Sequence, residues 1–123
     1  LIQNRYLGER MKKMDGKFLG KIVKAEFGAW RDRPFMMGLQ LEFRFDGNCG
    51  VNCGGRHLVN ISEQCLWDSE EQKHQAFQKL LEETNGILKD AKVSTVSELV
   101  GKPIEITIED QMYKEFRILT EVL

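Results

Sequence analysis

The sequence carries little net charge, and this shortage excludes several classes of function. Its 18 lysine and arginine residues are balanced by 19 aspartate and glutamate residues, which leaves a formal net charge of -1. A chain with so little net charge has no long-range field that would attract nucleic acid or an anionic membrane. Nonspecific binding to DNA is therefore disfavoured, although a local basic stripe is compatible with this composition.

Long apolar runs are also missing. No stretch approaches the about 20 apolar residues that a helix needs to cross a bilayer. The first residues, LIQNRYLGERMKKMDG, lack the apolar centre of a signal peptide. We therefore expect a cytoplasmic protein with no membrane partner. In a reducing cytosol its 3 cysteines would serve as metal ligands or as buried side chains rather than in structural disulfides.

Motifs of common catalytic and nucleotide-binding sites are missing as well. No phosphate-binding loop is present, and Gly54-Gly55 lacks the third glycine and the following helix of a dinucleotide-binding turn. A cysteine and a histidine could pair as nucleophile and base, but no acid that would orient them can be identified. We expect a protein that is not an enzyme and that has no small-molecule substrate.

The composition is that of one folded domain. With 123 residues, 41% of them hydrophobic and 30% charged, the chain is long enough for one core and too short for two domains of ordinary size. We expect residues 17–123 to form this domain, with residues 1–16 as an N-terminal extension.

Alternating apolar residues predict strands in the first half of the domain. The alternation covers residues 17–27 and is clearest over residues 35–45. A turn signal, Asp-Gly-Asn, follows at residues 46–48. After a glycine-rich patch, HLVNI predicts a third strand over residues 57–61.

Helical spacing of apolar residues then predicts one long helix. Ser69 and Gln72 form a capping-box pattern at its start. Gly86 lies inside the pattern, and a glycine there costs about 1 kcal/mol relative to alanine. We therefore expect the helix to break or kink near Asn85.

The last part of the sequence predicts a short helical turn over residues 95–101 and two strands, over residues 103–110 and 115–123. The order β-β-β-α-β-β predicts an α+β fold with a small, mostly antiparallel sheet and one long helix. The same order occurs in the OB-fold, a small Greek-key barrel. An open antiparallel sheet with the helix on one face has this order too, so both arrangements remain open.

The glycine-rich patch, GNCGVNCGGRHLVNISEQC, contains all three cysteines and one of the two histidines. Three thiolates and one imidazole are a known ligand set for structural zinc. This inventory predicts Zn²⁺ bound by Cys49, Cys53, His57 and Cys65, although their spacing is tighter than in the recurring zinc motifs. His74, on the long helix, could replace His57 or Cys65.

Two other interpretations of the patch remain open. The cysteines could be small buried side chains, with the glycines at a bulge or tight bend. One cysteine could instead be redox-active or nucleophilic. If zinc is bound, four protein ligands complete its coordination and leave no position for water, so the metal would be structural and not catalytic.

The segment GAWRDRPF is the strongest candidate for a binding surface. Trp30 and Phe35 could stack on bases of single-stranded nucleic acid while Arg31 and Arg33 neutralise phosphates. Tryptophan and arginine are also typical of protein interfaces. A polar hairpin loop held by one aromatic residue is the simplest alternative.

Several segments resemble a set of small phage and prophage proteins. They lie between residues 21 and 123 and read KIVKAEFG, GLQLEF, CGVNCGGRHL, ILKDAKVSTVSELVGKPIEITI and FRILTEVL. The stretch from residue 87 to 108 is the most similar. Cys49 and Cys53 stand where that set has aromatic residues, a difference that would suit conversion of the patch to metal binding.

The resemblance implies a phage or prophage setting more than a mechanism. Small phage proteins of this charge are often inhibitors of host defence, and the largest such class is the anti-CRISPR proteins. We therefore expect a type II anti-CRISPR-like inhibitor that occludes a surface of an RNA-guided effector nuclease. Glu105 and Glu109 could then face a basic channel of this host defence protein. An OB-fold-like phage accessory protein that binds single-stranded DNA is the alternative.

Overall fold

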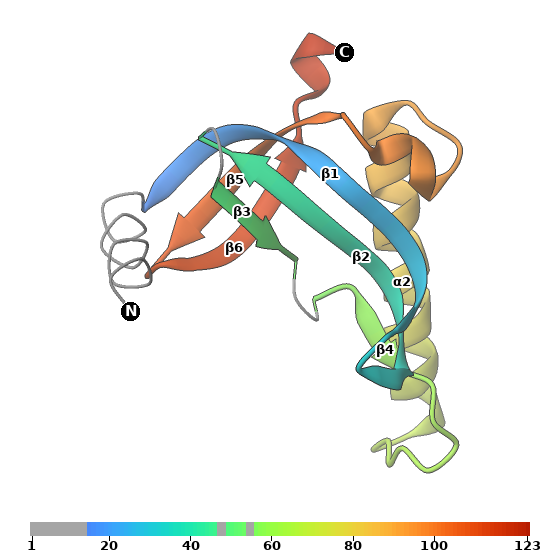
Figure 1. Cartoon of the computed structure of the whole chain (residues 1–123). Coiled ribbons are helices and arrows are strands. Elements are labelled where there is room, and N and C mark those ends of the chain that lie inside the picture. Colours follow the sequence, from blue (N-terminus) through green and yellow to red (C-terminus); the bar gives the residue numbers. More distant parts are fainter. Residues whose placement is uncertain (1–14, 47–48, 54–55) are drawn as a thin grey trace.

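The computed structural model describes residues 15–46, 49–53 and 56–123 (Figure 1). Residues 1–14 of the predicted N-terminal extension therefore lie outside the described part of the chain. In chain order the elements are β1 (Gly16–Trp30), β2 (Arg33–Phe45), β3 (Cys49–Asn52), β4 (Leu58–Asn60), α2 (Glu70–Ala91), η1 (Val96–Leu99), β5 (Pro103–Glu109), β6 (Met112–Ile118) and η2 (Thr120–Val122).

The strands form one antiparallel sheet in the order β3-β2-β1-β5-β6, and β4 also pairs with β2. Together with the single long helix of the described residues, this confirms the predicted α+β fold. Of the two arrangements that the sequence left open, the structure has the open sheet. Its end strands β3 and β6 are not paired with each other within the described residues, so the closed OB-like barrel is not formed.

β1 is long because it changes partner along its length. It pairs with β5 over residues 16–21 and with β2 over residues 20–30. A register shift after Ile22 marks this change of partner. Ile22 itself is bonded to the segment that precedes β5. Its N–H donates to the Lys102 carbonyl (3.1 Å), and its carbonyl accepts from the Gly101 N–H (2.7 Å). The β1–β2 hairpin therefore extends beyond the part of β1 that β5 covers.

Two short strands, β3 and β4, lie on the side of β2 that faces away from β1. β3 pairs with the last residues of β2, and β4 pairs with β2 near its start. The structure thus confirms a strand within residues 57–61 and adds β3, which the sequence analysis did not predict. A strand of 4 residues, such as β3, is too short for its alternation to be recognised.

α2 begins as predicted and continues through Gly86, so the predicted break near Asn85 is wrong. The Ser69 hydroxyl accepts a hydrogen bond from the Gln72 N–H (3.0 Å), which confirms the cap. Ile87 and Leu88, directly after the glycine, pack against the core. Full burial of such a side chain contributes about 1.5 to 3 kcal/mol, so the partial burial of two of them can offset the cost of about 1 kcal/mol for one glycine.

β6 starts three residues earlier than predicted and ends at Ile118, so the predicted strand over residues 115–123 is wrong in its bounds. Asp110 and Gln111 adopt positive φ angles of 53° and 65°. Two consecutive residues of this kind form the tight hairpin turn whose twist suits antiparallel strands. The strand therefore begins directly at Met112, and the chain after it forms the short helix η2.

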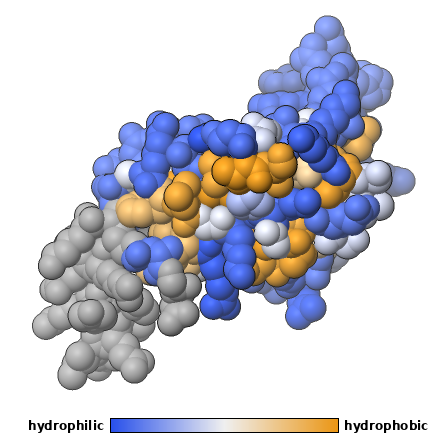
Figure 2. Space-filling view, turned by 90° about the horizontal axis from the view of Figure 1, so that it is seen from above, coloured by the Kyte–Doolittle hydropathy of each residue, from blue (hydrophilic) through white to orange (hydrophobic). Residues whose placement is uncertain are grey.

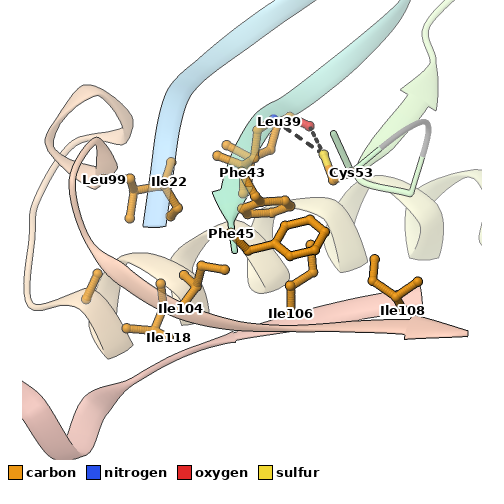
Figure 3. Close-up of a cluster of buried hydrophobic side chains, with 12 residues drawn as sticks. Ile22, Leu39, Phe43, Phe45, Cys53, Leu99, Ile104, Ile106, Ile108 and Ile118 are labelled. Atoms are coloured by element: carbon orange, nitrogen blue, oxygen red, sulfur yellow. Dashed lines mark hydrogen bonds between the residues drawn. The ribbon is translucent and has the colours of Figure 1, made fainter. Parts of the chain in front are cut away.

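The core lies between two parts of the strongly curved sheet. Figure 3 shows Phe43 and Phe45 of β2 directed towards Ile104, Ile106 and Ile108 of β5. Fully or almost fully buried members of the core include Ile22, Leu39, Phe43, Leu99, Ile104, Ile106 and Ile108. The two halves of the sheet therefore bury their apolar faces against each other. The C-terminal half of α2 covers one side of this core.

Candidate functional site

Cys53 occupies the gap between β3 and β4, where it completes the hydrogen bonding of β2. Its N–H donates to the Leu41 carbonyl (3.0 Å), and the next bond along β2 runs from the Leu39 N–H to the His57 carbonyl (3.0 Å). Between these two bonds, the Leu41 N–H donates to the Cys53 thiol (3.4 Å). The thiol in turn lies 3.8 Å from the Leu39 carbonyl, to which it donates (Figure 3). The side chain thus replaces a peptide group of the ladder.

The surroundings of Cys53 favour a neutral thiol. The residue is 1% exposed, and burial raises the pKa of the thiol, an effect that the hydrogen bond from the Leu41 N–H opposes but does not cancel. Because the thiolate is the nucleophile and the metal ligand, the buried interpretation describes Cys53 in this conformation better than the other two.

The other predicted zinc ligands have separate surroundings. Cys49 is half-buried in β3 and packs against the core. His57 precedes β4, and its Nδ1 lies 3.2 Å from Oε2 of Glu83 on α2. Cys65 is half-buried between β4 and α2, and His74 is exposed near the start of α2.

No three histidine, cysteine, aspartate or glutamate side chains are gathered to hold a metal ion within residues 15–46, 49–53 and 56–123. Residues 54–55, inside the predicted zinc-binding patch, lie outside the described part of the chain. Zinc binding by Cys49, Cys53, His57 and Cys65 therefore stays a prediction.

The predicted partner-binding residues Trp30, Arg31 and Arg33 lie together where β1 turns into β2. Arg31 and Arg33 are exposed, whereas Trp30 is half-buried. Trp30 lines a hollow of about 170 Å³ together with Gln40, whose amide donates to the Gly28 carbonyl (3.2 Å). Its ring is thus partly engaged by the protein's own strands, and the two arginines are the more accessible part of the predicted site.

Exposed apolar side chains occur on the strands near these arginines. Phe27 and Phe35 are 43% and 44% exposed, and Ile61 is 43% exposed. Ile61 lies beside Phe35, because its N–H donates to the Phe35 carbonyl (2.8 Å). We call this region the hairpin surface, defined by Phe27, Trp30, Arg31, Arg33, Phe35 and Ile61.

The molecule also exposes apolar surface at the opposite end from the hairpin surface. In Figure 2, which looks onto that end, apolar residues form patches that are separated by hydrophilic ones. Leu19, Val100 and Val122 are among the large apolar side chains that are at least half exposed. Patches divided in this way are normal for a folded protein and do not define a site.

Glu105 and Glu109, which were predicted to meet a basic partner, are paired within the sheet. The Arg117 Nε donates to Glu105 Oε1 (3.2 Å), and the Lys114 Nζ lies 2.7 Å from Glu109 Oε2. The hydrogen bond to Glu109 raises the pKa of Lys114. A basic partner would have to compete with Lys114 and Arg117 for these carboxylates, and their role in partner binding stays a prediction.

A groove that the sequence analysis did not predict runs between α2 and β6. It has a volume of about 540 Å³. Its walls include Glu83, Gly86 and Ile87 from α2, and Tyr113, Phe116 and Ile118 from β6. A possible signal in the sequence was Gly86, a poor helix former in the middle of a strong helix pattern.

One end of this groove is closed by the chain that precedes β4. The His57 imidazole meets Glu83 and also packs edge-on against Phe116, with ring centres 6.4 Å apart. The Arg56 guanidinium lies 5.4 Å from the centre of the Tyr113 ring, and its Nη2 donates to the Tyr113 carbonyl (3.4 Å). A cation is therefore held at this end by an aromatic ring and a backbone carbonyl.

No known family model matches the sequence, and no curated protein or solved structure matches it either. Among the described residues, no helix is long and apolar enough to cross a membrane. Function must therefore be inferred from the hairpin surface and the groove.

Proposed function

We propose that this protein is a phage-encoded, non-enzymatic inhibitor that covers a surface of a host defence protein, with the RNA-guided nuclease of a type II CRISPR system as the first candidate. The observation that carries the proposal is the hairpin surface, where exposed Phe35 and Ile61 lie beside exposed Arg31 and Arg33. Aromatic residues and arginines supply most of the binding energy of protein interfaces. The phage setting rests on the resemblance of residues 87–108.

A protein partner suits the hairpin surface better than a nucleic acid does. The two arginines flank Asp32, and the whole chain has a net charge of -1. Binding to nucleic acid draws most of its strength from several cations placed along the phosphate backbone. An apolar surface with a few charges at its margin is instead typical of protein interfaces.

The test is a DNA-cleavage assay with a purified type II effector nuclease and its guide RNA. We expect the protein to inhibit cleavage, and the double variant Arg31→Glu/Arg33→Glu to need about tenfold more protein for the same inhibition. Phe35→Ser should weaken inhibition by a similar factor, because it removes apolar contact area. Arg44→Glu is the matched control, because Arg44 is also exposed on β2 but lies near its other end.

Two results would contradict the proposal. One is cleavage that proceeds unchanged at any ratio of protein to nuclease. The other is inhibition that is equally strong with the double variant. If the protein is instead retained on single-stranded DNA, and salt and Trp30→Ala both weaken the retention, the single-stranded DNA-binding alternative is favoured.

A further inference from the structure

β6 presents an open strand edge to the groove. The Leu119 N–H donates to the Pro103 carbonyl (3.0 Å), so this pair belongs to the bonded positions of the β5–β6 ladder. Antiparallel strands alternate between bonded and non-bonded pairs. Counting back from Leu119, the backbone groups of Arg117 and Glu115 therefore point towards β5. The backbone groups of the intervening residues, Phe116 and Ile118, point away from β5. No other described strand pairs with β6, so its outer edge is unpaired among the described residues. Phe116 is half-buried and Ile118 is 4% exposed, so Phe116 offers the more accessible backbone groups.

The opposite wall of the groove has a gap at Gly86. A Cβ atom added to this glycine would meet nothing within 4 Å, so the packing of the described residues does not require a glycine there. Because the residue lines the groove directly, the missing side chain widens it. The groove between α2 and β6 is therefore wider at Gly86 than a side chain at this position would leave it.

Arg56 places a positive charge in the groove, whose lining also includes Glu83, Asp90 and Glu115. Arg56 is exposed, and no carboxylate among the described residues lies within ion-pair distance of it. Lys114 also lines the groove, where its Nζ pairs with Glu109 Oε2 (2.7 Å). The guanidinium is held over Tyr113 and has further N–H donors to offer, which makes it suited to an acidic side chain.

We propose that this groove binds an extended peptide segment of a partner protein, which adds a strand to β6 and places an acidic side chain against Arg56. Backbone hydrogen bonds to Phe116 and Ile118 supply affinity that depends little on sequence, and the contact with Arg56 supplies selectivity. Strand addition of this kind needs an open edge, space beside it and a complementary charge. The site is independent of the hairpin surface, so either proposal can fail alone.

The experiment is a selection from a displayed library of random ten-residue peptides, carried out on the full chain. We expect enriched peptides to share an aspartate or glutamate at one position and alternating apolar residues beside it. Binding of the most enriched peptide is then measured by calorimetry. Amide hydrogen exchange of Phe116 and Ile118 should slow in the complex, because both N–H groups become bonded to the peptide.

Three variants distinguish the groove from other surfaces. Gly86→Leu places a side chain in the groove and should weaken binding by about tenfold or more, while the higher helix propensity of leucine preserves the fold. Arg56→Glu should also weaken binding by about tenfold, through charge reversal. Asn85→Leu is the control, because Asn85 is exposed on the same helix and does not line the groove. Circular dichroism and thermal unfolding establish that each variant is folded.

Several outcomes would overturn the proposal. One is a selection that enriches no peptide, and another is binding that Gly86→Leu leaves unchanged. A peptide that binds without slowing exchange at Phe116 and Ile118 would exclude strand addition. If a single-stranded oligonucleotide binds the protein and Gly86→Leu weakens this binding, the groove would be assigned to nucleic acid instead.

Discussion

At the scale of single residues, Cys53 shows how one side chain can complete a β-ladder. A thiol is small and apolar enough for the core, yet it can donate and accept weak hydrogen bonds. Both properties are used, because the thiol accepts from the Leu41 N–H and donates to the Leu39 carbonyl. These two buried backbone groups of β2 therefore stay bonded between its pairing with β3 and its pairing with β4.

Cys53→Ala should destabilise the protein more than Cys49→Ala does. The first substitution removes the thiol from two backbone groups of β2, and leaving a buried group unsatisfied costs about 1 to 3 kcal/mol. Cys49 is half-buried, so its truncation removes less packing. The measurement is urea unfolding of both variants beside the parent protein. Equal losses of unfolding free energy would show that the thiol contributes packing alone.

The zinc prediction is tested by elemental analysis of protein purified without added metal. The predicted ligand set requires about one zinc per chain, which Cys49→Ser and Cys65→Ser should each remove along with thermal stability. Cys53 would have to turn away from the β2 backbone and lose its proton to bind the ion. Well-folded protein that contains no metal would reject the prediction.

At the scale of elements, Arg117 fastens the C-terminal helix η2 to the sheet. Its Nη1 donates to both carboxylate oxygens of Glu121 (3.0 and 3.2 Å), and its Nε donates to Glu105. The hydrogen bond from Arg117 lowers the pKa of the Glu121 carboxyl. A carboxyl with a lowered pKa in the folded state stabilises the fold above its unfolded pKa, and this contribution is lost as the pH falls through the lowered value.

Arg117→Met should therefore lower the unfolding midpoint near neutral pH. The difference from the parent protein should shrink as the pH falls below about 4, because Glu121 becomes protonated in both proteins. It should also shrink at high salt, because the pair is exposed to solvent. The measurement is thermal unfolding across this pH range. A difference that stays constant down to about pH 2 would attribute the effect of Arg117 to packing.

α2 and β1 offer a matched pair of glycine substitutions with opposite signs. Gly86→Ala should raise the free energy of unfolding by about 0.5 to 1 kcal/mol, because alanine restricts the unfolded chain and its Cβ meets nothing here. Gly20→Ala should lower it, because its Cβ would collide with the Arg44 carbonyl of the neighbouring strand. Thermal unfolding measures both. A loss of stability in Gly86→Ala would show that the helix needs the glycine for its own packing.

At the scale of the whole molecule, the parts predicted from the sequence are those that bury one continuous face. The alternation over residues 35–45 and the helical spacing after Ser69 each repeat often enough to be recognised, and both elements are confirmed. The short strand β3 was missed because its 4 residues show too little alternation. The turn at Asp110 was missed because neither Asp110 nor Gln111 is a glycine, the residue that most readily adopts a positive φ angle. Residue types near the hairpin turn were sufficient to predict that Arg31 and Arg33 are exposed.

The groove and the role of Cys53 depend on tertiary contacts that a sequence pattern does not contain. Glu83 meets His57, which is 26 positions earlier, and Arg56 meets Tyr113, which is 57 positions later. Nothing in the spacing of these residues indicates that they share a surface. The cysteine and histidine inventory predicted a shared metal site, whereas in the described residues Cys53 turns to the strand backbone and His57 turns to α2.

The prediction that residues 17–123 form one domain can be tested with a chain that begins at Asp15. The Asp15 carboxylate accepts a hydrogen bond from the Gln111 N–H (3.0 Å), and the first residues of β1 pair with β5, so this chain keeps both contacts. We expect it to unfold in one cooperative transition, with a midpoint close to that of the full chain. A chain that begins at Ile22 should fail to fold, because it lacks the β1–β5 ladder that joins the two halves of the sheet. Two separate transitions, or a large loss of stability in the chain that begins at Asp15, would contradict a single domain that starts near residue 17.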